Sequence, residues 1–459
     1  MNEIKNYGYI DNLSLSEYIA FPIYIIIIFL ISYYVQYKHI RKNPLYKYYT
    51  IAVFLKVIGA VSFCLVYIFV YKGGDTISYF ESARALTNLL EQRPNNFLKV
   101  FLEKGTIENY YLFDGRSTGY PWMHMFIEPK SFFLVKILVP FMLLSFQSFV
   151  LCTIILSWAS FAGIWRLFLM FTNVYKTISR NLAIAILFIP SVVFWGSGML
   201  KDTVTLSASC WFIYALYFTF ILKIKRFRYS IILLISAYVI FAIKPYILFA
   251  LLPGVIIWVV YDKVVTLKKK VIKYLFIPLV YLVSFGTGYL VLSQIGDFDI
   301  KHLINEASIK QTDLKRVEYK GNSFDIGSYS NVNGAISLAP EAIIAGLYRP
   351  YIWEAKNIVM FLSGIENLVY LGLTIFILSR IRFLRLLKIL FDNPLILFCL
   401  SYSILFALII GLSTSNFGAL VRFKIAFLPE FLGTLVILNY YMKNKGVTKM
   451  EEQDMENGK

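Results

Sequence analysis

Repeated apolar runs of about 20 residues constrain this chain more than any other feature of its sequence. The first covers residues 17–37 and the second 50–71, and similar runs recur along most of the chain. An α-helix needs about 20 apolar residues to cross a bilayer. Hydrophobic residues make up 58% of the 459 residues, more than a soluble domain of this size could bury. The sequence therefore predicts an all-α, polytopic membrane protein.

Basic residues are distributed unevenly between the loops that would separate these runs. Five short loops carry 19 Lys and Arg residues but two acidic residues, whereas two long loops carry 14 basic and 15 acidic residues. Loops rich in Lys and Arg stay on the cytoplasmic side of a membrane. Membrane orientation therefore explains the net charge of +18, and no nucleic acid partner is expected.

These patterns predict a single integral membrane domain over 1–459, a transmembrane helix bundle of about 11 spans in the cytoplasmic membrane. The N-terminus would lie outside, and a charged tail at 443–459 would lie in the cytoplasm. Two long outer loops carrying interfacial helices are expected at 72–148 and 294–357, the first with amphipathic pieces at 76–92 and 96–102. Besides 17–37 and 50–71, the predicted spans are 149–171, 182–200, 203–222, 231–243, 246–261, 274–293, 358–378, 394–412 and 425–442.

Some apolar segments carry local features that modify this plan. Segment 132–146 has about 15 residues, which is short for a crossing, so we expect it to be interfacial or re-entrant. Pro245 has no N–H to continue a helix, so Lys244-Pro245 should separate two short spans. Lys56, in the second span, is expected to reach the cytoplasmic surface by snorkelling. Free buried thiols without metal-binding spacing are expected at Cys64, Cys152, Cys210 and Cys399.

Asp75 is the strongest candidate for a catalytic residue. It follows Lys72-Gly-Gly at the end of the second span and opens the first long polar loop. An acidic residue where a membrane helix reaches the surface is costly unless it is solvated or functional. Asp75 could take a proton from an attacking hydroxyl group, or hold a divalent cation such as Mg or Mn. The alternative is that it only caps a helix beginning at Thr76.

Basic residues at the ends of predicted elements form the second part of the candidate site. Lys244 lies at a helix break, Arg349 precedes a proline, and Arg422 follows Asn-Phe-Gly. Arg binds a phosphate through its bidentate fork and Lys binds it as a point charge. These three residues are therefore candidate phosphate ligands, and lipid head-group binding or snorkelling is the alternative for each.

Further polar residues on the same predicted side complete the candidate set. Lys201 and Asp202 could bind substrate, although a mutual ion pair that holds a turn is the other interpretation. Trp353 and Glu354 follow Arg349 closely, and a cation, an aromatic ring and an acid suit a sugar or its phosphate. Anchoring of aromatic residues at the membrane interface explains the same segment equally well. Glu366, within a span, is expected to be a structural partner of a nearby base.

The spacing Gly74-Asp75-x-x-x-Tyr79-x-x-x-Ala83 resembles the C-type glycosyltransferase superfamily, whose members are polytopic enzymes. The resemblance implies a polyprenyl-phosphate-linked sugar as donor and a glycan, lipid or protein as acceptor. It implies Asp75 as the base, Tyr79 as a binding residue and basic residues of the outer loops as ligands of the carrier phosphate. Asp75 is followed by Thr76, whereas protein mannosyltransferases have an Asp-Glu pair.

Two other functions fit a polytopic chain with this charge pattern. An O-antigen or capsular polysaccharide polymerase also uses a polyprenyl-linked donor, but depends on arginines more than on an acid. A non-enzymatic transporter of lipid-linked glycans would need charges at the bilayer midplane and often carries internal repeats. The sequence shows little of either beyond Glu366, and no nucleotide-binding or metalloprotease motif is present.

Overall fold

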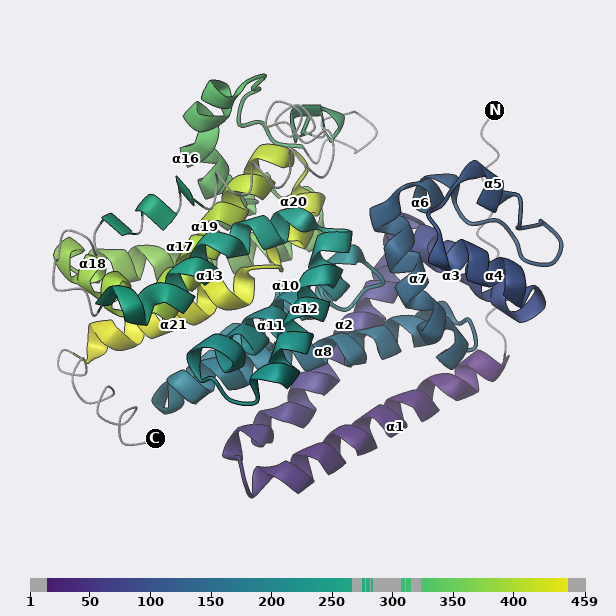
Figure 1. Cartoon of the computed structure of the whole chain (residues 1–459), viewed down its shortest axis with the longest axis horizontal. Helices are drawn as coiled ribbons and strands as arrows, with labels where there is room; N and C mark the ends of the chain where they lie inside the picture. Colours follow the sequence, from purple (N-terminus) through teal and green to yellow (C-terminus); the bar gives the residue numbers. More distant parts are fainter. Residues whose placement is uncertain are drawn as a thin grey trace. The chain divides into compact units, whose positions relative to one another are not determined.

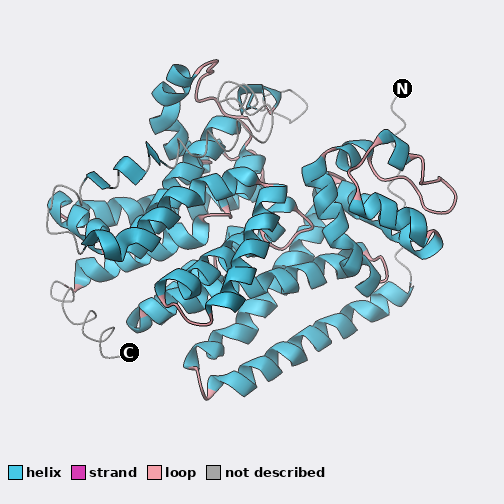
Figure 2. Ribbon diagram, viewed as in Figure 1, coloured by secondary structure: helices cyan, strands magenta, loops and turns pink. Residues whose placement is uncertain are grey.

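The computed structural model describes residues 15–265, 275–276, 278–280, 282–283, 307–309, 311–314 and 323–444. These residues form helices joined by turns and loops (Figure 2), and Ser323 and Asn416 form an isolated β-bridge. The all-α prediction is therefore confirmed for the described chain. The predicted span 274–293 lies largely outside these residues, as does the tail at 443–459.

Seven helical segments of the described residues are long and apolar enough to cross a membrane. They support a membrane protein, but the count of about 11 spans is not confirmed, and the orientation stays a prediction. The seven segments are Ile19–Ile40, Pro44–Tyr71, Phe149–Val174, Lys201–Ile221, Arg226–Ile243, Ile358–Arg380 and Pro394–Ser413.

Two predicted spans are interrupted in the structure. Segment 182–200 contains two short helices, α9 (Ser179–Leu187) and α10 (Pro190–Trp195), rather than one continuous helix. Pro190 explains the break because it lacks the N–H that a continuing helix would use. Segment 425–442 begins with a turn and becomes helical only at α21 (Leu428–Lys443). Segment 132–146 lies in α7 (Pro129–Leu144) except for its last two residues, and α7 is not among the seven long segments.

The chain divides into two compact units, which are described separately. The first unit comprises Met1–Leu169, Val192–Tyr214 and Ile231–Lys244, and the second comprises Met170–Ser191, Ala215–Ser230 and Pro245–Lys459. The first unit contains, wholly or mainly, α1 (Leu15–Ile40), η1 (Pro44–Tyr48), α2 (Tyr49–Leu65), η2 (Val66–Tyr71), α3 (Asp75–Gln92), α4 (Pro94–Leu102), α5 (Ile107–Tyr110), α6 (Met123–Ile127), α7, α8 (Phe149–Val174), α10, α11 (Lys201–Leu216) and α12 (Arg226–Ile243).

The polar loop after the second span folds onto the first unit through α3 and α7. The expected amphipathic pieces form α3 and α4 with nearly the predicted boundaries. Tyr79, Ala83 and Leu86 recur at helical spacing on one face of α3, and this face is buried in a core with Phe132 of α7 and Phe149 of α8. This buried face holds α3 against α7 (Figure 1).

The second unit is built around α19 (Pro394–Ser413), which packs against α13, α16 and α21 (Figure 1). Small residues allow α16 and α19 to approach closely. A Cβ at Gly346 would overlap the carbonyl group of Ala407, and one at Gly411 would overlap that of Ala342. The described helices of this unit are η3 (Lys176–Ile178), α9, η4 (Tyr217–Ile221), α13 (Pro245–Val265), α16 (Val332–Tyr348), η6 (Ile352–Glu354), α17 (Ile358–Arg380), α18 (Phe383–Asp392), α19, α20 (Phe417–Lys424) and α21.

Replacing Gly346 with Ala should lower the free energy of unfolding by about 1–3 kcal/mol, because the added methyl group forces α16 and α19 apart. Gly372→Ala is the matched control, since no neighbouring atom lies within 4 Å of the position its Cβ would take. All four cysteines are buried free thiols, so a thiol-reactive dye reports thermal unfolding in detergent. Equal unfolding midpoints for the two variants would contradict the close crossing.

Candidate functional site

A tight turn presents Asp75 at the start of α3. Lys72, Gly73 and Gly74 all have positive φ, at 51°, 145° and 108°, and glycine adopts such angles without a steric penalty. The helix begins at Asp75 itself with Gly74 as its N-cap, so the interpretation of Asp75 as only the cap of a helix starting at Thr76 is wrong. The Asp75 side chain is exposed, and its negative charge lies in the first helical turn, where the helix dipole favours it.

Lys201, at the start of α11, connects Asp75 with other charged groups of the first unit. Its ammonium nitrogen lies 2.9 Å from a carboxylate oxygen of Glu128. Asp75 and Lys244 are also close enough to act electrostatically on the Lys201 charge. We call Asp75, Glu128, Lys201, Asp202 and Lys244 the charged cluster. The structure thus brings together four of the predicted site residues with Glu128, an acid that the sequence analysis did not single out.

Asp202 and Lys244 form the buried part of the charged cluster. The Lys244 ammonium lies 2.5 Å from the Asp202 carboxylate, and their side chains are 8% and 3% exposed. Asp202 therefore pairs with Lys244 while Lys201 pairs with Glu128, so the expected mutual pair of Lys201 and Asp202 is replaced by two longer-range pairs. The break between α12 and α13 at Lys244-Pro245 agrees with the prediction. Because Asp202 already compensates the charge of Lys244, Lys244 is a weaker candidate for binding a phosphate.

Glu128 links the charged cluster to Tyr79 through Ser131. The Ser131 hydroxyl donates to the Glu128 carboxylate, and the Tyr79 hydroxyl lies 3.4 Å from the Ser131 oxygen. Burial disfavours the Glu128 carboxylate, but the Ser131 hydrogen bond and Lys201 hold its pKa below the ordinary value. Glu128 is therefore ionised at neutral pH. Tyr79, a predicted substrate ligand, is buried and is linked to this carboxylate through Ser131.

Residues of α2 fix the loop that leads into Lys201. Lys56 is buried and donates to the carbonyl oxygen of Gly196, so the prediction that it snorkels to the cytoplasmic surface is wrong. A Cβ at Gly198 would overlap the ring of Phe63. The Thr203 hydroxyl donates to the Gly198 carbonyl oxygen at 2.6 Å. These contacts give the start of α11 a defined position relative to α2.

An apolar groove of about 370 Å³ lies beside the charged cluster. Its walls come from α7, α8, α11 and α12, and most of the lining side chains are apolar. Val204 lines the groove and lies three residues after Lys201, so the groove reaches within one helical turn of the cluster along α11. Trp211 lines it two turns further along the same helix. A ligand with a long apolar tail and a charged head fits these surroundings.

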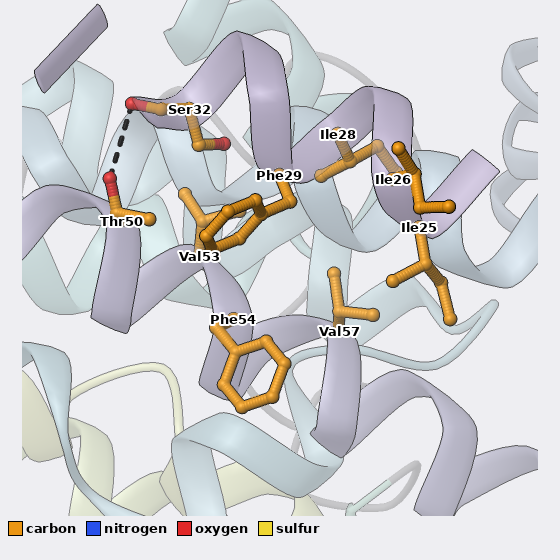
Figure 3. A pocket seen from close by; sticks show the side chains of 9 residues that line it. All are labelled: Ile25, Ile26, Ile28, Phe29, Ser32, Thr50, Val53, Phe54 and Val57. Carbon is orange, nitrogen blue, oxygen red and sulfur yellow. Dashed lines mark hydrogen bonds between the residues drawn. The ribbon is translucent and has the colours of Figure 1, made fainter. Parts of the chain in front are cut away.

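A second, smaller pocket of about 170 Å³ lies between α1 and α2 (Figure 3). Phe29, Val53 and Val57 are among its mostly apolar lining residues. The Thr50 hydroxyl donates to the backbone oxygen of Ser32 at 3.2 Å, closing one end. No charged side chain lines this pocket, so its described walls offer packing for an apolar group but no acid–base chemistry.

The second unit holds the other predicted site residues. Arg349 donates to Glu354 from its Nε at 2.9 Å and also from its terminal nitrogen. Its guanidinium group lies over the rings of Phe324 and Phe417, 4.8 and 5.7 Å from their centroids. Trp353 is exposed and stacks on a neighbouring tyrosine, which fits either a sugar platform or an interface anchor.

Lys424 holds the backbone around Arg349. It is buried and donates to the carbonyl oxygens of Leu347 and Arg349, at 3.0 and 2.5 Å, and to the Asn367 side chain at 3.2 Å. Its three ammonium protons therefore have three acceptors, and its role is structural. Arg422 lies two residues before Lys424 in α20, and its guanidinium group lies 5.3 Å from the centroid of the Phe423 ring.

Glu366 is held by groups other than a paired base. Its carboxylate accepts from the backbone N–H of Ser191 at 3.1 Å, from the Ser191 hydroxyl at 2.6 Å and from the Tyr370 hydroxyl. Lys424 acts on it only electrostatically among these contacts. This geometry agrees with the expected structural role of Glu366. Its partners, however, are Ser191 and Tyr370 rather than the base that the sequence suggested.

The predicted residues thus fall into two sets. Asp75, Tyr79, Lys201, Asp202 and Lys244 belong to the first unit, whereas Arg349, Trp353, Glu354 and Arg422 belong to the second. That both sets face one cavity stays a prediction. Within the described part of the chain, no three His, Cys, Asp or Glu residues are grouped to hold a metal ion. A divalent cation at Asp75 would need further oxygen ligands from a substrate.

Comparisons with protein-family models, with curated proteins and with solved structures find no match to this chain. What the protein does is therefore inferred from its residues and their geometry.

Proposed function

We propose that this protein is a membrane glycosyltransferase of the C type. It would transfer a sugar from a polyprenyl-phosphate-linked donor to a glycan, lipid or protein acceptor on the outer face of the cytoplasmic membrane. The observation that carries this proposal is the apolar groove whose Val204 wall lies within one helical turn of Lys201. A polyprenyl phosphate has an apolar tail and a charged head. The groove of the first unit suits the tail, and the charged cluster suits the head.

Asp75 acts as the general base in this proposal. The acceptor hydroxyl oxygen forms a bond to the anomeric carbon of the sugar, and Asp75 takes the hydroxyl proton. The bond between the anomeric carbon and the phosphate oxygen breaks, and its electron pair leaves with the polyprenyl phosphate. Exposure of Asp75 at the start of α3 leaves room for an acceptor.

Lys201 stabilises the departing phosphate. An ammonium group has three donors and Glu128 takes one, so Lys201 can donate to a phosphate without breaking this pair. Ser131 and Lys201 hold Glu128 in its ionised form, and the Glu128 carboxylate in turn fixes the position of the Lys201 ammonium group. Asp202 and Lys244 form a buried ion pair that supports this arrangement.

A direct test reconstitutes the full chain in liposomes with a panel of polyprenyl-monophosphate and polyprenyl-diphosphate sugars. The readout is release of the free carrier lipid in the presence of membrane extract as acceptor source. We expect release from at least one monophosphate donor. Movement of an intact lipid-linked sugar between leaflets, with no carrier released from any donor, would contradict the proposal and favour a transporter.

Filling the apolar groove should weaken donor binding specifically. Ala159 lines the groove, and Ala159→Phe would displace about two methylene groups of a bound tail, which raises the KM for the donor about 10-fold. Little change is expected in kcat, because the tail contributes equally to substrate and transition-state binding. Leu234→Phe, on the exposed side of α12, is the matched control. If the two variants have the same KM for the donor, the polyprenyl tail does not bind in this groove.

A further inference from the structure

Helix α18 is strongly amphipathic and does not belong to the candidate site. It runs from Phe383 to Asp392, entirely within the described residues, and Ile389 is its buried side chain. Phe383 and Leu384 are 70% and 79% exposed, which is unusual for two adjacent large apolar residues in water. An exposed apolar face of this kind needs a covering partner or a membrane.

The position of α18 in the chain restricts what covers it. It joins α17, which ends at Arg380, to α19, which begins at Pro394, and both helices are long and apolar enough to span a membrane. A ten-residue helix between two such spans lies at the surface of the bilayer. The exposed apolar residues are therefore within reach of the interfacial region.

Basic residues accompany the apolar face. Arg380, Arg382, Arg385 and Lys388 lie within nine residues, and Asp392 is the nearby acid. At helical spacing, Arg385 and Lys388 share one side of α18, whereas Phe383 and Leu387 share another. A helix with this division lies in the plane of a membrane interface, with the apolar side in the acyl region and the basic side among head groups.

One of these cations also docks the helix on its own unit. The Arg385 guanidinium donates to the backbone oxygen of Tyr441 at 2.8 Å, near the C-terminal end of α21. A cation at this end of a helix compensates the negative end of the helix dipole. Arg382 and Lys388 are exposed.

We propose that α18 is an interfacial helix that binds the head groups of anionic phospholipids. Phe383 and Leu384 enter the bilayer, while Arg382 and Lys388 pair with lipid phosphates. Anionic lipids are favoured over zwitterionic ones because the segment carries four positive charges against one negative charge. This inference is independent of the proposed enzyme activity.

The test measures retention of phosphatidylglycerol and phosphatidylcholine by the full-length protein in native mass spectrometry. Arg382→Gln combined with Lys388→Gln should weaken phosphatidylglycerol binding about 20-fold, the effect expected for two interfacial charges. The matched control is Arg226→Gln combined with Arg228→Gln, a second exposed basic pair beside the exposed Phe227. Equal losses in the two double variants would mean a general charge effect and overturn the assignment.

A second variant tests the apolar side without changing charge. Phe383→Ser combined with Leu384→Ser should also reduce phosphatidylglycerol retention, and both side chains are exposed, so the fold should be kept. Thiol-dye unfolding of the buried cysteines checks the fold directly. Inorganic phosphate in excess should not displace the lipid. Displacement by phosphate, or unchanged retention in this variant, would show that α18 binds an anion without inserting.

Discussion

Replacing Asp75 with Asn is expected to lower release of the carrier lipid about 10²–10⁴-fold, the contribution of a positioned general base. Asn keeps the shape of the side chain but cannot accept the proton of the attacking hydroxyl. The fold should be retained, because Asp75 is exposed and its loss removes about 0.3–1 kcal/mol of interaction with the dipole of α3. The measurement is turnover in liposomes at saturating donor.

Glu91→Gln is the matched control for this prediction. Glu91 is an exposed carboxylate near the far end of the same helix, more than four turns from Asp75, and its replacement should leave turnover unchanged. If Asp75→Asn keeps full activity, the glycosyltransferase mechanism fails. A polymerase that depends on arginines would then become the better explanation, and Arg349 and Arg422 would be the next residues to replace.

Local patterns in the sequence predicted much of the fold. Apolar runs predicted most of the long helices, and the amphipathic pieces expected at 76–92 and 96–102 correspond to α3 and α4. These features depend on residues within a few turns of one another. Interruption of segment 182–200 was missed, although Pro190 stands inside it, because the average hydropathy of the segment outweighed a single residue.

Long-range pairs explain what the sequence analysis missed in the site. Glu128 contacts Lys201 across 73 residues, and Lys56 contacts Gly196 across 140 residues. No periodicity relates such positions, so Lys201 was assigned to its neighbour Asp202, and Lys56 to the membrane surface. The sequence did indicate the helix start beside Glu128, because Pro129 follows it and proline is favoured at the first position of a helix.

Breaking the buried pair of Asp202 and Lys244 should have the largest effect on stability. Asp202→Leu or Lys244→Met alone leaves one uncompensated charge in a buried site and should lower the free energy of unfolding by about 3–5 kcal/mol. The double variant removes both charges and should recover most of this loss, since apolar residues of similar size replace a buried pair at little net cost.

Unfolding of the first unit can be followed separately in a Cys399→Ser background, because Cys64, Cys152 and Cys210 are buried there. Additive losses in the double variant would show that the two residues do not stabilise each other.

Carrier release by the same double variant decides the role of Lys244. A folded protein with an unchanged KM for the donor would mean that Lys244 only supports the site, and that Lys201 is the cation that meets the phosphate. A raised KM in the folded double variant would instead show that Lys244 binds the donor despite its pairing with Asp202.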